Sequence, residues 1–187
     1  MRKSIRVEAM GLLFALGLTF GAASAKAADL PAGGLKGDAL NAAMRAQGMT
    51  VIAPPDQPVV LMNSEELYAG ASTNGGRGEQ VLVQQGGHPC SFVLEFDAPL
   101  SQLSFNRSRL LAGPSGITHP VWTATAQDAA GHSLSTASEA EIRSYSDVPA
   151  RRFTLSGPGI KRVVFWGDDR GFDAFCNVIT DTMDWTR

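Results

Sequence analysis

The sequence predicts an all-β fold, an antiparallel β-sandwich of the jelly-roll type with one short N-terminal helix. Short apolar runs rich in β-branched and aromatic residues recur from residue 79 onward, and turn residues separate them at intervals of roughly 8 to 12 residues. Residues 153–181 show this pattern most clearly: Gly157-Pro158-Gly159 and the segment 167–171 interrupt three such runs.

The N-terminal segment has the order of a secretory signal peptide. A basic start, Met1–Arg6, precedes the apolar run Met10–Ala22 and the small residues Ala23-Ser24-Ala25. We expect cleavage after Ala25, or after Ala27 as second choice. A membrane anchor is the alternative, but the apolar run is short for a span of about 20 residues. The pattern therefore predicts an exported protein, periplasmic or extracellular, with no membrane span after processing.

Length and charge limit the possible organisation and partners. The chain has 187 residues, with 16 Lys and Arg against 18 Asp and Glu, scattered along its length. Such a mildly acidic chain is a poor candidate for binding nucleic acid or an anionic membrane surface. Without the signal peptide (1–25), the length suits a single domain. We expect a leader and short helix in 26–48 and one β-sandwich domain in 49–187.

Residues 38–47 form the best helix candidate. Asp38 can cap its start, Gly48 suits its exit, and one side is largely apolar, formed by Leu40, Ala43, Met44 and Gln47. Strands are expected at 50–53 and 58–62 around a Pro54-Pro55 turn. A capped helical turn is expected at 64–68 and a glycine-rich surface loop at 70–78.

From residue 79 the pattern is that of strands. Phe92, Leu94 and Phe96 alternate with smaller or polar residues, so they share one face of a strand. Asp97-Ala98-Pro99 is expected to break this strand, and Asp128–Gly131 to form a turn. The apolar pattern resumes with Leu100, Leu103 and Phe105, and Phe153 and Leu155 are expected to form the next core-facing pair. The run that follows consists of β-branched and aromatic residues, as strands usually do: Ile160, Val163, Val164, Phe165 and Trp166.

Parts of the chain resemble known exported domains. Segments 96–105, 127–134 and 153–165 look like the paired strands of secreted bacterial jelly-roll domains. Segment 172–178 is similar to the final strand of galactose-binding-like sandwiches, an architecture that many carbohydrate-binding modules share. The resemblance covers about residues 80–181. It implies a β-sandwich that binds sugars through exposed loop aromatics and often holds a structural calcium ion.

The chain has two cysteines, Cys90 and Cys176. Export makes a disulfide chemically permissible, and a pair in such a chain is more often bonded than free. We expect a buried Cys90–Cys176 disulfide that joins the last strand to an early one, with free thiols as the alternative.

Three carboxylates, those of Asp168, Asp169 and Asp173, surround one turn. Calcium prefers several oxygen ligands, so a structural calcium ion is one interpretation. A solvated hairpin tip without an ion is the interpretation we prefer. The histidines, His88, His119 and His132, lack zinc-site spacing. No other cofactor is expected.

Aromatic residues give the binding hypothesis. Tyr68, beside the glycine-rich loop, and Trp185, near the end of the chain, are the residues expected to be exposed for ligand stacking. Trp122 and Trp166 lie in strands and are expected to pack in the core. The leading hypothesis is an exported, non-catalytic protein that binds a carbohydrate or cell-envelope polymer. A structural or protein-interaction domain is the alternative, and a small carboxylate-based hydrolase ranks third.

Overall fold

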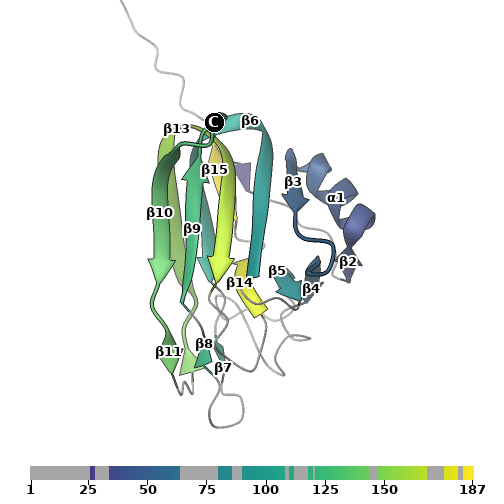
Figure 1. Cartoon of the computed structure of the whole chain (residues 1–187), viewed down its shortest axis with the longest axis vertical. Helices are drawn as coiled ribbons and strands as arrows, with labels where there is room; N and C mark the ends of the chain where they lie inside the picture. Colours follow the sequence, from purple (N-terminus) through teal and green to yellow (C-terminus); the bar gives the residue numbers. More distant parts are fainter. Residues whose placement is uncertain are drawn as a thin grey trace, which may run out of the picture.

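The computed structural model describes residues 26–27, 34–63, 80–85, 90–107, 110–111, 118–119, 121–143, 147–167, 175–180 and 183–187. Within this part the chain is a sandwich of antiparallel sheets with one short helix, so the predicted fold class is confirmed (Figure 1). No helix among the described residues has the length and apolar character needed to cross a membrane. The predicted signal peptide, the helical turn at 64–68 and the loop at 70–78 lie outside the described residues.

Two long strands form the centre of the sandwich. β6 (Cys90–Arg107) and β13 (Arg151–Gly167) pair antiparallel along their whole length. The register shifts between Ser156 and Arg162, and Figure 1 shows β6 arching over at one end of the molecule. The expected break at Asp97-Ala98-Pro99 is therefore wrong, because these residues lie within the arch and the ladder continues past them. Likewise, Gly157-Pro158-Gly159 forms an irregular part of β13 rather than a chain-reversing turn.

Two contacts lie at the arch. The ammonium group of Lys161 donates hydrogen bonds to the carbonyl oxygens of Phe96 and Asp97, at the level of the register shift. Gly157 meets β10 (Ser133–Glu139) closely, since a Cβ at this position would lie 2.8 Å from the Cβ of Leu134. A residue without a side chain is needed there.

The arch places the two halves of the β6–β13 pair face to face. Phe105 lies opposite Phe153 in one half, and Phe92 lies opposite Phe165 in the other. The rings of Phe105 and Phe165 are 5.3 Å apart between centroids, in an edge-to-face arrangement. This geometry is favourable for aromatic pairs, so one pair of strands supplies both layers and the contact between them.

Other strands extend each half. The front sheet is defined here as β3 (Met49–Ile52), the first half of β6, the second half of β13, β9 (Trp122–Gln127) and β10, in that order. The back sheet consists of the other halves of β6 and β13 with β15 (Asp184–Thr186) and β1 (Lys26–Ala27). The predicted inward alternation holds for Phe92, Leu94 and Phe96, which are all buried.

A four-stranded sheet completes the sandwich. Its order is β14 (Phe175–Thr180), β5 (Gln80–Gln85), β4 (Val59–Asn63) and β2 (Leu35–Lys36). Leu61 and Leu82 from this sheet join the same core as the phenylalanines. Two small ladders pair β7 (Leu110–Leu111) with β12 (Asp147–Val148), and β8 (Thr118–His119) with β11 (Ile142–Arg143).

The helix, α1 (Gly37–Ala46), packs beside β3, as Figure 1 shows. Leu40 and Met44 are buried, as the pattern predicted. The predicted cap by Asp38 is wrong: Lys36 occupies the N-cap position without a side-chain hydrogen bond, and Asp38 lies in the first turn. A carboxylate in the first turn still interacts favourably with the positive end of the helix dipole. The exit at Gly48 is confirmed, with φ of 85°.

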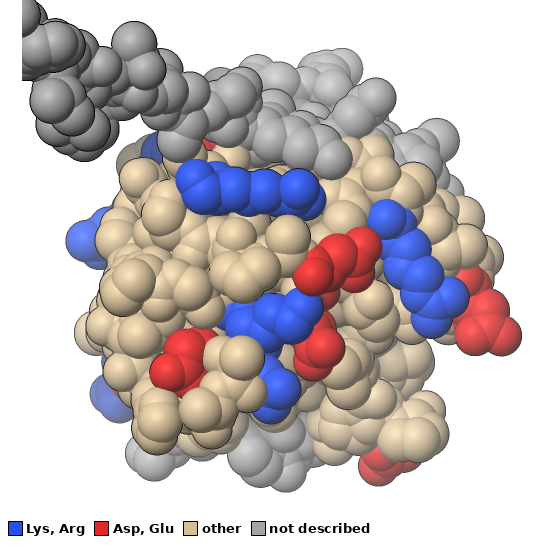
Figure 2. Space-filling view, turned by 90° about the horizontal axis from the view of Figure 1, so that it is seen from above, with Lys and Arg blue, Asp and Glu red and all other residues tan. Residues whose placement is uncertain are grey.

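Two expected turns are confirmed. The backbone N–H of Gln57 donates to the carbonyl of Pro54 at 3.0 Å. At the β9–β10 turn, the backbone N–H of His132 donates to the carboxylate of Asp128 at 2.9 Å, and this hydrogen bond lowers the pKa of Asp128. Figure 2 shows the arched end of the molecule, where acidic and basic side chains are interspersed.

Candidate functional site

The outer face of the front sheet carries the exposed apolar surface of the described chain. Ile52, Val121 and Trp166 are the large apolar side chains exposed there, at 48%, 38% and 38% respectively. Ile52 lies opposite Val93 on β6, and Val93 lies opposite Val164 on β13. We define the apolar stripe as Ile52, Val93, Val164, Trp166 and Val121.

Strand alternation places these residues on one face. Val163 and Phe165 are buried, so Val164 and Trp166 between and after them point outward. Trp122 is 3% exposed and packs in the core, so Val121 before it falls on the outer side by the same alternation. The stripe therefore crosses several strands of the front sheet.

Hydroxyl side chains flank Trp166. In the register of the sheet, Ser91 of β6 and Thr123 of β9 lie on either side of it. One row further along, Thr125 lies opposite Val164, and its hydroxyl is 3.2 Å from that of Thr136 on β10. An indole with neighbouring hydroxyls offers an apolar surface bordered by hydrogen-bonding groups.

A charged pair lies beyond Val164. Arg162 is opposite Glu95, with Nη2 and Oε2 3.8 Å apart and both side chains more than a third exposed. Such an exposed ion pair contributes little to stability. The two charges offset each other, so the stripe has no excess charge from this pair.

The outer face of the back sheet differs from the front. Arg152, Thr154 and Ser156 of β13 are exposed on it, and the Arg152 guanidinium forms an ion pair with Asp184 of β15. The Thr154 hydroxyl lies 3.0 Å from that of Ser104 on β6. Polar groups dominate this face, which leaves the front sheet as the candidate binding surface.

A buried ion pair connects the two layers below the stripe. Arg107, on β6, donates from Nε to Oε2 of Glu139 on β10 at 2.8 Å, and from Nη2 to Oε1 at 3.2 Å. The indole N–H of Trp122 also donates to Glu139 Oε2, at 3.2 Å. Burial raises the pKa of Glu139, but the hydrogen bond and charge of Arg107 outweigh this, so its pKa is below the ordinary value. Because both groups are nearly inaccessible, we assign the pair a structural role.

Of the two aromatic residues expected to be exposed, Trp185 is described. It is only 2% exposed, and its ring packs 6.4 Å from that of Phe96. Its expected exposure is wrong, because β15 pairs with β6 and turns the indole into the core. Tyr68 lies outside the described residues.

The proposed calcium ligands, Asp168, Asp169 and Asp173, also lie outside the described residues, so a calcium site there stays a prediction. Among the residues that the structure does describe, no three His, Cys, Asp or Glu side chains form a group suited to a metal ion.

The two cysteines are described by their backbone. Cys90 lies opposite Gly167 on β13, and Cys176 lies opposite Gln84 on β5. β14, which carries Cys176, lies beside β6. β15 follows β14, so Cys176 is in the penultimate strand rather than the last one. The disulfide itself remains a prediction.

Trp166 also differs from its predicted position. The sequence predicts it in the core, yet it is 38% exposed on the front sheet. The available signal was its position directly after Phe165, since strict alternation allows only one of two adjacent strand residues to face a one-sided core.

Comparisons with known proteins found similar solved structures, all of low sequence identity to this chain. No protein-family model and no curated protein sequence matches it. The similar solved structures include carbohydrate-binding modules. One is the family 11 module of a Clostridium thermocellum cellulase, with 9% identity, 88% of this chain and 95% of that chain covered, and a TM-score of 0.37.

Two other similar structures are an adhesin domain and an α-L-arabinofuranosidase. The K2 adhesin domain of Lys-gingipain has 12% identity over 75% of this chain and 89% of that chain, with a TM-score of 0.45. An arabinose-bound α-L-arabinofuranosidase has 14% identity over 78% of this chain, with a TM-score of 0.44, and this chain spans only 24% of its length. At these scores the comparisons carry no argument about function.

Proposed function

We propose that the protein is an exported, non-catalytic β-sandwich that binds a carbohydrate or cell-envelope polymer through the apolar stripe. The observation that carries this proposal is Trp166, an indole 38% exposed on an ordered sheet face between two hydroxyl-bearing neighbours, Ser91 and Thr123. Export rests on the signal-peptide pattern of the first 25 residues.

The chemistry of the stripe suits a sugar. A pyranose ring has an apolar face of C–H groups and a rim of hydroxyls. Trp166 can cover the apolar face, while Ser91, Thr123 and Thr125 can donate to or accept from the rim. Because strand residues hold these groups, little conformational entropy is lost on binding.

The test is a glycan array with the mature protein, followed by calorimetric titration with the polymer that it retains. We expect Trp166→Ala to weaken binding about tenfold or more, since truncating a central aromatic anchor costs on the order of 2 kcal/mol. Trp166→Phe should retain part of the affinity. Gln102→Ala, an exposed change on the back sheet, is the matched control and should leave binding unchanged.

Two results would contradict the proposal. One is that no glycan or envelope polymer is retained by the correctly folded protein. The other is that Trp166→Ala binds as tightly as the unchanged chain. If the stripe instead captures a protein, the alternative of a protein-interaction domain replaces the proposal.

A further inference from the structure

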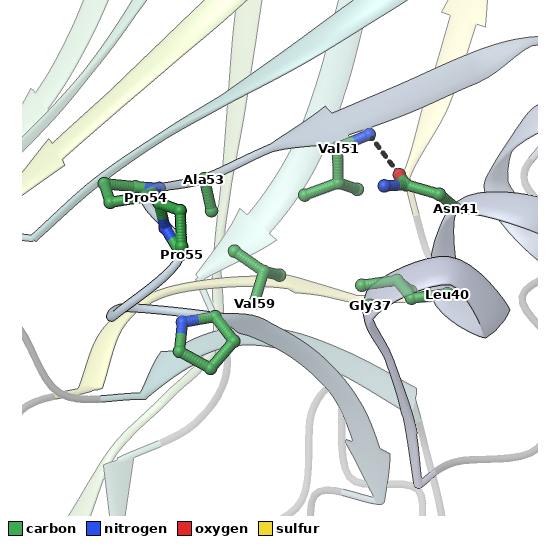
Figure 3. A pocket seen from close by; sticks show the side chains of 9 residues that line it. Gly37, Leu40, Asn41, Val51, Ala53, Pro54, Pro55 and Val59 are labelled. Atoms are coloured by element: carbon green, nitrogen blue, oxygen red, sulfur yellow. Dashed lines mark hydrogen bonds between the residues drawn. The ribbon is translucent and has the colours of Figure 1, made fainter.

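The β3 edge of the front sheet is closed by α1. Figure 3 shows the contact: the backbone N–H of Val51 donates to Oδ1 of Asn41 at 3.0 Å, beside a pocket of about 190 Å³ between α1 and the β3–β4 turn. Val51 lines this pocket and Ile52 follows it in β3, so strand alternation turns Ile52 to the opposite side. The helix therefore holds the edge strand in place and leaves Ile52 on the outer face of the sheet.

The outward side chains of the front sheet form parallel rows that cross its strands. We define the aliphatic row as Ile52, Val93 and Val164, which lie side by side on β3, β6 and β13. Trp166 belongs to the next row, two residues from Val164 on the same strand and therefore about 7 Å along it. The indole and the aliphatic row are thus close enough to contact one sugar and its substituent.

A sugar that carries only hydroxyl groups fits the indole but not the aliphatic row. A pyranose ring on Trp166 directs a substituent toward Val164, whose side chain has no hydrogen-bonding group. A hydroxyl at this place would lose hydration without gaining a partner, which costs free energy. A methyl group at the same place would bury apolar surface favourably. The row therefore favours a sugar with a substituent that ends in a methyl group.

Two threonine hydroxyls determine which substituent of this kind fits best. Thr125 on β9 lies opposite Val164, and its hydroxyl is 3.2 Å from that of Thr136 on β10. Whichever oxygen donates in this contact, the other hydroxyl keeps a proton to donate, and both oxygens keep lone pairs that accept. An acetamido group has the matching atoms, an N–H and a carbonyl oxygen, next to its methyl. A deoxy sugar has the methyl but no amide, so it would leave the threonines unused.

The charges on this face favour a neutral ligand. Within the rows, the charged side chains are those of Glu95 and Arg162, which have opposite sign and lie 3.8 Å apart. They offset each other, so they do not select an acidic or a basic polymer. The ammonium group of a deacetylated amino sugar would lie over Val164 and lose hydration there. Acetylation removes that charge and supplies the methyl group.

We propose that the front sheet binds a polymer of N-acetylated hexosamines. A sugar ring covers Trp166, its acetamido methyl lies on Val164 and Val93, and its amide forms hydrogen bonds with Thr125 and Thr136. This inference rests on the proposed function and names the class of sugar that the same face selects. The order of side chains carries it, because an indole, an aliphatic row and a pair of threonines adjoin one another on an ordered sheet.

Calorimetric titration of the mature protein with matched trimers tests the class of sugar. The trimer of N-acetylglucosamine differs from cellotriose, the glucose trimer of the same linkage, only in the acetamido groups. We expect the acetylated trimer to bind about tenfold or more tightly, since a site that buries an additional methyl group discriminates on this order. The deacetylated, cationic trimer should bind no more tightly than cellotriose.

Val164→Thr separates recognition of the acetamido group from sugar binding in general. The exchange keeps the shape of the side chain and replaces one methyl by a hydroxyl. We expect the preference for the acetylated trimer to fall to about threefold or less, while the affinity for cellotriose is retained, which also shows that the variant is folded. Trp166→Ala should weaken both trimers together. Thr154→Val, the reverse exchange at an exposed position of the back sheet, is the matched control and should change neither affinity.

The outcomes distinguish this inference from the proposed function. Equal or tighter binding of cellotriose, or an unchanged preference in Val164→Thr, would overturn the N-acetyl inference. The proposed function would stand in that case if Trp166→Ala still weakens binding. Retention of other glycans without the acetylated trimer would have the same meaning. If the folded protein retains no glycan at all, both the inference and the proposed function are wrong.

Discussion

At the scale of single residues, Glu139 shows how the interior holds a charge. Its carboxylate receives hydrogen bonds from Arg107 and from the indole of Trp122, and the Arg107 Nη1 group donates to the carbonyl of Pro149 at 3.0 Å. These contacts compensate for the lost hydration of two ions, so the pair is tolerated between the layers.

Removing the carboxylate charge should therefore be costly. We expect Glu139→Gln to reduce the free energy of unfolding by about 3 to 5 kcal/mol, because it leaves the Arg107 charge buried without its counter-ion. Urea denaturation measures this change. Glu141→Gln is the control: Glu141 pairs with the exposed Arg143, and the change should cost less than about 1 kcal/mol. Equal effects of both changes would contradict the structural role of the buried pair.

The same carboxylate should make stability depend on pH. The pKa of Glu139 is lower in the folded protein than its ordinary value of 4.5, so its contribution to stability is fully present above pH 4.5. As the pH falls below this value and through the lower folded pKa, the contribution is lost. Urea denaturation between pH 7 and about pH 2 measures the free energy of unfolding of the protein and of Glu139→Gln. The difference between the two free energies should become smaller as the pH falls. A difference that stays constant over this range would contradict the assignment.

At the scale of secondary structure elements, Gln84 brings the two cysteine-bearing strands together. Its side-chain amide donates to the carbonyl of Ser91 at 2.9 Å, and its backbone lies opposite Cys176. Ser91 is the neighbour of Cys90, so both cysteines belong to the region around one buried glutamine. This arrangement is compatible with the bond predicted from the sequence.

We expect a Cys90–Cys176 disulfide that joins β6 to β14. Reduction, or the change Cys176→Ser, should reduce the free energy of unfolding by about 2 to 5 kcal/mol, because the closed loop spans much of the chain. Mass spectrometry after alkylation without reduction measures the bond. Two alkylated cysteines per chain would refute it.

At the scale of the whole molecule, the position of β1 relates the predicted processing to the fold. Lys26 and Ala27 pair with Trp185 and Asp184 of β15 at the end of the back sheet. Cleavage after Ala25 would retain both residues of β1, whereas cleavage after Ala27 would remove them.

We therefore expect a mature chain that starts at Lys26. The intact mass of protein recovered from the cell envelope or medium should correspond to loss of residues 1–25. A mature protein that still carries Met1 would refute export by this route, and a start at residue 28 would show that β1 is dispensable.

The sequence by itself determined the fold class and much of the local structure. Alternation in Phe92, Leu94 and Phe96 identified a core-facing strand, and Gly48 and Asp128 identified a helix exit and a turn. These features depend on residues that are close together in the chain. Their spacing alone specifies which face of a strand a side chain occupies, or where the chain reverses direction.

Only the tertiary structure decided which surfaces are exposed and which distant residues meet. Trp185 is buried because β15 pairs with β6, and Trp166 is exposed because β13 turns Phe165 inward instead. The contact between Arg107 and Glu139 likewise depends on the arch that places the two layers face to face. Side chains that alternate along a strand define its two faces. Only the pairing of that strand with distant strands decides which face meets the core.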